Sequence, residues 1–325
     1  MLKKTMDMYL FPQAHHKLCI LAKAGHLKYD GWNFERPTDP HCMVLEAQIK
    51  GLTEDLSEVV SKLSEDATPK CVHRLRTTIR RIESLISYAH PDLGKKQERS
   101  LEKLEELRRR AGKVRDIDVQ SRLLDHLGNG STAKDRRTLL SLLEKRRERQ
   151  LKRLRSALVR LADHKLFSRL ERVAERVGNG PSGDNRPLAP LEEARLQLSR
   201  LAADFSSRPS LKPNRLHEAR IQLKKIRYLA ELADDSNERK MFLEQLKSVQ
   251  DAVGEWHDWE ELTNLAEKRF ADRVNCALLR EVRALFSAQE AAAVSSVTRL
   301  FSAPVGANKK APAAASSFRT FARHA

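Results

Sequence analysis

The stretch that decides the fold is Val72–Ile82 (VHRLRTTIRRI), because it returns 144 residues downstream as Leu216–Ile226 (LHEARIQLKKI). Both copies share the frame His-x-x-Arg-x-x-x-basic-basic-Ile, in which cations and apolar residues recur at helical spacing. A second pair follows in the same order: Leu101–Asp116 (LEKLEELRRRAGKVRD) returns 142 residues downstream as Leu243–Asp258 (LEQLKSVQDAVGEWHD). We call these pairs the His motifs and the Gly-Asp motifs. Two matched motifs in the same order indicate a duplicated module.

Composition supports a helical protein that is long enough to bury a large core. The chain has 325 residues with few glycines, prolines and aromatic residues, and it is rich in Leu, Ala, Arg, Glu and Lys. It holds no run of about eighteen apolar residues, and charged residues interrupt its start, so we expect neither a membrane span nor a secretion signal. The cysteines show no CxxC spacing, which favours free thiols and a cytoplasmic location; they are Cys19, Cys42, Cys71 and Cys276.

The apolar pattern predicts helices throughout the central part of the chain, divided by one linker. A helix starts near His41 and breaks at Thr68-Pro69, and the first His motif continues to His90-Pro91. The next helices are predicted at 95–112 and, after a turn at Gly112, on to 127; then at 133–163, 165–177 and 188–205. The second His motif is followed by helices through 253, from 256 to 270 and from 272 to 301.

These elements give an all-α fold with internal pseudo-two-fold symmetry. We predict an N-terminal arm at 1–40 with no sustained period, a first four-helix bundle at 41–178, a Gly/Pro-rich linker at 179–187, a second four-helix bundle at 188–302 and a disordered basic tail at 303–325. Each half holds enough helices to build a bundle around its own core.

The formal charge of +17 indicates a polyanionic ligand, and the arrangement of the basic residues narrows the choice among polyanions. Residues three, four and seven apart share one helix face, so each His motif carries a row of cations above an apolar side. The first row is His73, Arg76 and Arg80 with Arg81 beside it; the second is His217, Arg220, Lys224 and Arg227 with Lys225 beside it. A rigid row of Arg and Lys suits a linear polyphosphate, which has no bases to stack.

The two His motifs, together with Gly-x-x-Arg-Asp and Gly-x-x-His-Asp downstream, resemble the CHAD domain, the conserved histidine α-helical domain. The resemblance covers roughly residues 41–302. It implies two helical bundles with a basic groove or pore between them, binding of inorganic polyphosphate and association with polyphosphate granules. It assigns to that surface the nine basic residues of the two rows, with Arg115 and His257 of the Gly-Asp motifs nearby.

Two features modify this expectation. Glu83 stands where comparison with Arg227 favours a basic residue, which weakens the far end of the first row. The helix predicted at 133–163 is a further source of cations for the groove, namely Arg146, Arg149 and Arg153, although Glu144 and Glu148 are equally compatible with an exposed face. Arg115-Asp116 and His257-Asp258 are open to a second interpretation as helix caps and local ion pairs.

Two alternative functions stay open beside polyphosphate binding. Nucleic-acid binding agrees with the charge, but only Tyr228 offers a stacking surface near a His motif. A metal or phosphate relay through His73 and His217 is disfavoured because their neighbours are cationic. No nucleophile with a neighbouring base, Gly-rich phosphate loop or acidic metal triad is present, so we expect no enzyme, no catalytic residue, no metal and no cofactor.

Overall fold

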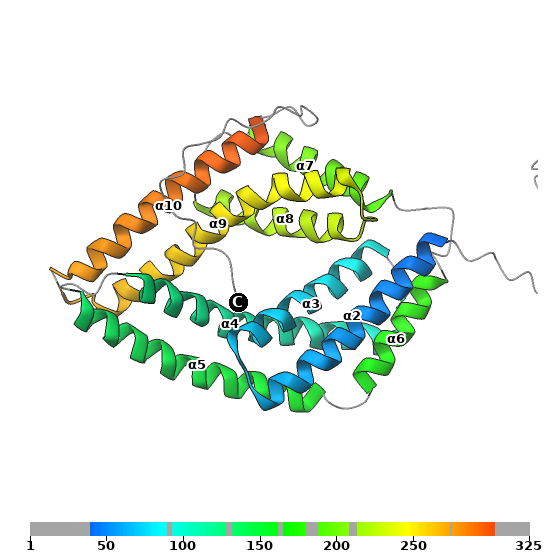
Figure 1. Ribbon diagram of the computed structural model, residues 1–325, viewed down its shortest axis with the longest axis horizontal. Helices are drawn as coiled ribbons and strands as arrows, with labels where there is room; N and C mark the ends of the chain where they lie inside the picture. Colours follow the sequence, from blue (N-terminus) through cyan, green and yellow to red (C-terminus); the bar gives the residue numbers. More distant parts are fainter. Residues whose placement is uncertain are drawn as a thin grey trace, which may run out of the picture. The chain divides into compact units, whose positions relative to one another are not determined.

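The computed structural model describes residues 40–89, 93–127, 132–161, 165–179, 188–207, 213–273 and 275–302. Across these ranges the chain forms nine α-helices and no strand (Figure 1), which confirms the predicted all-α class. All of them belong to one compact unit, Asp39–Ala325; the other unit is Met1–Thr38. The predicted arm, the tail and nearly all of the linker lie outside the described residues. No helix that the structure describes is long and apolar enough to cross a membrane.

The helices before the linker carry the first His and Gly-Asp motifs, and those after it carry the second. The first group is α2 (Pro40–Glu65), α3 (Pro69–Ala89), α4 (Lys95–His126), α5 (Ala133–Leu161) and α6 (Lys165–Gly178). The second group is α7 (Pro190–Ser207), α8 (Pro213–Glu231), α9 (Asn237–Arg269) and α10 (Ala277–Ser302). The His motifs therefore lie on α3 and α8, and the Gly-Asp motifs on α4 and α9.

Local capping explains two of the helix starts. The hydroxyl of Thr68 accepts a hydrogen bond from the backbone N–H of Cys71 at 3.2 Å, and Pro69 follows as the first residue of α3. Ser236 caps α9 in the same way, accepting from the N–H of Arg239 at 3.1 Å. The break expected at Thr68-Pro69 is thus confirmed as a helix start.

The predicted turn at Gly112 is wrong, because α4 runs without interruption through this residue. Gly112 is buried, and a methyl group built on it would lie 3.7 Å from Cζ of Arg76, so the guanidinium group of Arg76 rests on the bare backbone of α4. A glycine inside a helix costs roughly 1 kcal/mol relative to alanine, which packing on both sides of a 32-residue helix readily offsets. The matching Gly254 lies inside α9, which is also continuous.

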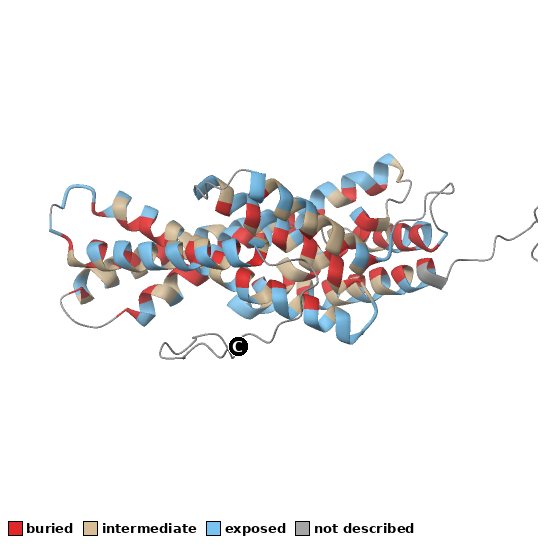
Figure 2. Ribbon diagram, turned by 90° about the horizontal axis from the view of Figure 1, so that it is seen from above, coloured by how far each residue is buried: buried red, intermediate tan, exposed pale blue. Residues whose placement is uncertain are grey.

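Within each group most helices pack on their neighbours in the chain, and the most extensive contacts between the groups involve two pairs of helices. In the first group α2 packs against α3 and α6, and α4 packs against α3, α5 and α6; in the second, α8 packs against α7 and α9, and α10 packs against α9 and α7. The groups meet where α3 packs on α8 and α4 on α9. Figure 2 shows buried residues as stripes along the helices, with exposed residues on their other faces.

The core differs from two self-contained bundles. One buried cluster contains residues of every helix, including Ile79 of α3 and Leu223 of α8. A second cluster joins the C-terminal part of α4 and the N-terminal part of α5 to α9 and α10, with Leu124 and Leu278 fully buried in it. Near it Asp135 of α5 forms an ion pair with Arg273, between α9 and α10. The two halves therefore share a core, because the apolar stripes of α4 and α9 extend beyond their own groups.

Candidate functional site

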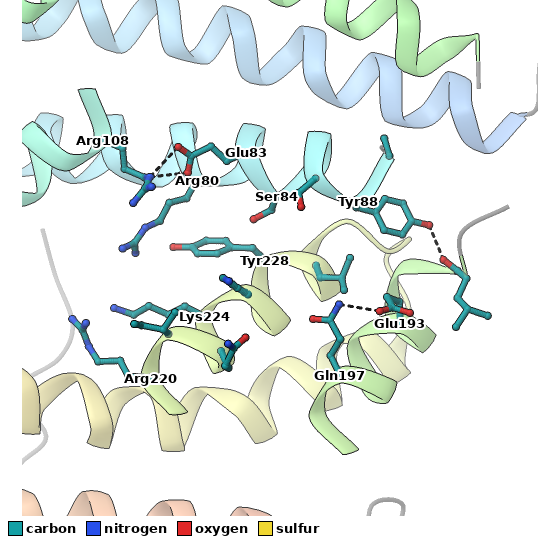
Figure 3. A pocket seen from close by; sticks show the side chains of 17 residues that line it. Arg80, Glu83, Ser84, Tyr88, Arg108, Glu193, Gln197, Arg220, Lys224 and Tyr228 are labelled. Atoms are coloured by element: carbon teal, nitrogen blue, oxygen red, sulfur yellow. Dashed lines mark hydrogen bonds and ion pairs between the residues drawn. The ribbon is translucent and has the colours of Figure 1, made fainter. Parts of the chain in front are cut away.

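Helices α3 and α8 carry the two His motifs to opposite walls of one cleft. The cleft has a volume of about 1160 Å³, and its lining includes Arg80 of α3 with Arg220, Lys224 and Lys225 of α8. Figure 3 shows the side chains of Arg80, Arg220 and Lys224 extending into the same space. Cations that lie 140 residues or more apart in sequence are therefore brought together because α3 packs against α8.

Crowding of these cations shifts their proton affinities. Burial, followed by the charges of Arg220 and Arg80, lowers the pKa of Lys224 to about 7. Burial and the charge of Arg80 lower the pKa of Arg76 to about 10. Like charges that are withdrawn from water disfavour the protonated form, so the positive charge of this cluster is incompletely compensated.

The distribution of ion pairs gives the same result. Within the described residues, Arg80, Arg115, Arg220 and Lys224 form no ion pair within 4.0 Å, and Arg76 has only a long contact of 3.8 Å with Asp116. Some arginines elsewhere are paired closely, such as Arg74 with Glu58 at 2.7 Å and Arg215 with Asp204 at 2.8 Å. Arg80, Arg220 and Lys224, which line the cleft, are thus left available for an external anion.

Arg76 and Arg220, which occupy matching positions of the two motifs, lie in similar surroundings. The Nε atom of each is buried and has no hydrogen-bond partner among the described residues. In the first half Asp116 is the nearest carboxylate to Arg76, and in the second the charge of Asp258 acts on Arg220. Burial raises the pKa of Asp258 to about 6 despite the cations around it. Asp116 and Asp258 lie inside α4 and α9, so they are not helix caps.

His73 and His257 lie beside these cations, and a lowered pKa holds both in the neutral form. Burial, then the charges of Arg115 and Arg76, lowers the pKa of His73 below its ordinary value. Burial and the charge of Arg220 lower the pKa of His257 to about 3. The rings of His217 and His257 lie 5.4 Å apart, centroid to centroid, across the α8–α9 contact. Neutral imidazole can still donate one hydrogen bond to a phosphate oxygen.

Arg81 and Arg227 are engaged elsewhere. Both pair with the carboxylate of Glu231, at 3.2 Å and 2.9 Å, and Arg227 also donates to the side chain of Gln250. Glu83, which occupies the position of Arg227 in the first half, pairs with Arg108 of α4 at 2.7 Å. This position therefore links neighbouring helices in both halves, with opposite charge.

The arginines Arg146, Arg149 and Arg153 lie on α5, which packs mainly against α4 and contributes no residue to the lining of the cleft. The Nε atom of Arg149 donates to the backbone oxygen of Lys145, one turn back. The structure does not bring these three residues to the cations of α3 and α8.

Several residues of this region were not predicted from the sequence. Arg122 acts through its charge on both His73 and Arg115. It lies seven residues after Arg115, on the same face of α4, so helical spacing was a usable signal. Tyr88 and the α7 residues Glu193 and Gln197 also line the cleft, and no motif indicates them.

Comparison with known proteins places this architecture in a family. The CHAD domain family model matches residues 45–267, and the chain belongs to this family. No match was found among curated proteins. The crystal structure of the CHAD domain from the plant Ricinus communis is similar, with a TM-score of 0.61 and 18% identity, covering 86% of this chain and 98% of that one. PptA from Streptomyces chartreusis is similar with a TM-score of 0.54 and 16% identity, covering 81% and 98%. At these identities the two structures support the fold.

Proposed function

We propose that this protein binds inorganic polyphosphate, without chemical conversion, in the cleft between α3 and α8. The observation that carries the proposal is the convergence of unpaired cations from both His motifs, Arg80 on one wall and Arg220 and Lys224 on the other. Membership of the CHAD domain family supports it, since polyphosphate binding is what the family resemblance implies.

The charges of polyphosphate complement the cations that line the cleft. A linear polyphosphate carries closely spaced negative charges, and each can accept hydrogen bonds from Arg or Lys. Burial and mutual repulsion lower the pKa of Lys224 and Arg76, and binding of an anion would compensate both effects. Through such binding the protein would associate with polyphosphate granules in the cytoplasm.

Nucleic acid is the competing polyanion, and a competition experiment separates the two. Labelled long-chain polyphosphate is bound to the full chain and displaced by unlabelled polyphosphate, single-stranded DNA or double-stranded DNA at equal phosphate concentration and salt. We expect polyphosphate to displace the label at least tenfold more effectively than either DNA. Equal displacement by DNA would contradict the proposal, as would shortening of the polyphosphate chain on prolonged incubation.

Two triple variants that remove the same number of positive charges test whether polyphosphate binds in the cleft. Replacement of Arg80, Arg220 and Lys224 by Gln is expected to weaken polyphosphate binding at least tenfold. The control replaces Arg146, Arg149 and Arg153 by Gln, which removes the same charge from α5, outside the cleft. We expect a loss of less than threefold there. Equal losses would mean that binding follows net charge alone.

A further inference from the structure

One end of the cleft is lined by groups that a phosphate chain does not need. Beyond the cations the lining contains the aromatic rings of Tyr88 and Tyr228 and the apolar side chain of Leu188, whose backbone oxygen accepts a hydrogen bond from Tyr88. Leu188 is 48% exposed, one of the few large apolar residues left so accessible in the described chain. Inorganic polyphosphate offers nothing apolar for these side chains to contact.

Tyr228 lies between the cations of the cleft and its aromatic end. It follows Lys224 by one helical turn on α8, so both side chains lie on the same face. Figure 3 shows its ring in the space between α3 and α8, with the hydroxyl directed toward the side of Arg80 and Lys224. A group bound on the ring is therefore adjacent to phosphate bound by these cations.

The far end of the cleft offers hydrogen-bond acceptors. Glu193 and Gln197 of α7 line it, and the amide of Gln197 donates to the carboxylate of Glu193 at 2.9 Å. The remaining carboxylate and amide oxygens accept hydrogen bonds from amino or hydroxyl groups. The negative charge of Glu193 repels phosphate, so a bound anion would direct its uncharged part toward this end.

We infer that the cleft also binds nucleoside triphosphates, with the phosphates on Arg80, Arg220 and Lys224 and the base against Tyr228. Its volume of about 1160 Å³ exceeds that of ordinary ligand pockets, which measure roughly 300–1,000 Å³, and leaves room for such a ligand. The inference shares its cations with the proposed function, so the two ligands compete. It depends on the aromatic end of the cleft, which the proposed function does not use.

The test compares ATP with inorganic tripolyphosphate, which has the same chain of three phosphates, one more ionisable oxygen and no nucleoside. Binding of ATP and of inorganic tripolyphosphate to the full chain is measured by isothermal titration calorimetry at fixed salt and without divalent cations. Because stacking of a base on an aromatic side chain contributes about 1–3 kcal/mol, ATP is expected to bind about tenfold or more tightly than tripolyphosphate. Tyr228→Leu should remove most of this preference by weakening ATP binding while tripolyphosphate binding changes less than twofold.

A charge reversal at the far end provides a second variant that does not touch the aromatic ring. Glu193→Lys should reduce the preference by strengthening tripolyphosphate binding. Glu192→Lys is the matched control, because Glu192 is exposed on the same turn of α7 and does not line the cleft. The control should keep the preference of the unmodified chain.

The outcomes separate this inference from the proposed function. Equal affinity for ATP and tripolyphosphate, or equal losses of both ligands in Tyr228→Leu, would overturn the nucleotide inference; the polyphosphate function stands if long chains still bind through the cleft cations. A retained preference for ATP in a protein that fails to bind long-chain polyphosphate would support the inference and overturn the proposed function.

Discussion

Arg81 on α3 and Glu231 on α8 form an ion pair across the contact between the two halves of the chain, with 3.2 Å between Nε and Oε2. The carboxylate of Glu231 is only 13% exposed and also accepts from Arg227 at 2.9 Å. One acidic side chain therefore compensates two cations of the His motifs and ties their helices together. Arg80, Arg220 and Lys224, which line the cleft, have no such partner among the described residues.

Replacement of Glu231 by Gln is expected to destabilise the protein by about 1–3 kcal/mol, because two arginines then lose their charged partner in a partly buried position. Chemical denaturation measures the change. Glu58→Gln is the control, since Glu58 pairs with Arg74 and Lys62 at an exposed site, where such pairs contribute about 0–1 kcal/mol. Equal changes in the two variants would show that the pair across the halves has no special role.

Polyphosphate affinity should fall as pH rises from about 7 to 9, because of Lys224. Its pKa is lowered to about 7 in the unliganded protein, and a bound anion raises it, so binding takes up a proton in this window. The affinity for polyphosphate should be highest below pH 7. It should drop roughly tenfold at higher pH, because one charge-assisted hydrogen bond, which contributes about 1.5 kcal/mol, is lost. Asp258, with a pKa of about 6, and His257, with a pKa of about 3, titrate below this window.

Two variants assign the pH dependence. Lys224→Arg keeps the charge at all these pH values and should bind with nearly constant affinity. His73→Gln should leave the dependence as it is, since burial and the surrounding cations already lower the pKa of His73. Loss of the dependence in His73→Gln instead would assign it to the histidine.

Replacement of Lys224 by Met should stabilise the unliganded protein while weakening anion binding. A lysine whose folded pKa is depressed reduces stability fully below its folded pKa, and this penalty disappears as pH rises from about 7 toward its ordinary value of 10.5. We expect the Tm at pH 6.5 to rise by about 2–4 °C, with a smaller difference at pH 10. Thermal unfolding at the two pH values measures it. A lower Tm for the variant at pH 6.5 would mean that packing of the lysine stem outweighs the charge.

The two glycines of the Gly-Asp motifs should respond differently to substitution. A methyl group on Gly254 meets nothing within 4 Å, so Gly254→Ala is expected to stabilise the fold by about 1 kcal/mol, the helix-propensity difference. Gly112→Leu should displace the guanidinium group of Arg76, which lies within 4 Å of the same methyl position, and weaken polyphosphate binding. Denaturation and binding measurements on both variants give the comparison. Unchanged binding in Gly112→Leu would show that the position of Arg76 does not matter.

Affinity for long-chain polyphosphate should fall steeply with salt, because each bound cation releases condensed counterions. About five phosphate contacts give a loss on the order of 100-fold between 50 and 200 mM salt. The triple Gln variant of Arg80, Arg220 and Lys224 should show a shallower slope. A flat response in the unmodified chain would remove the electrostatic basis of binding.

The helical class, most helix boundaries and the resemblance to the CHAD domain were accessible from the sequence because they depend on local spacing. A helix repeats every 3.6 residues, so a short stretch of sequence is enough to recognise the rows of cations in Val72–Ile82 and Leu216–Ile226. The turn predicted at Gly112 was wrong because the prediction used local sequence alone, in which a glycine favours a turn. The presence of glycine there is explained by its contact with Arg76, which lies on another helix.

The roles of individual cations depend on residues far away in the chain, and only the folded structure distinguishes them. Arg80 and Arg81 are neighbours in one motif, yet Arg80 faces the cleft and Arg81 pairs with Glu231, 150 positions away. Burial and the charge of Arg220 lower the pKa of Lys224 to about 7, and the packing of α3 on α8 adds to this effect because it brings Arg80 and Arg76 close. Charge and periodicity are local properties of a chain, whereas pairing, burial and proton affinity arise from the neighbours that tertiary packing supplies.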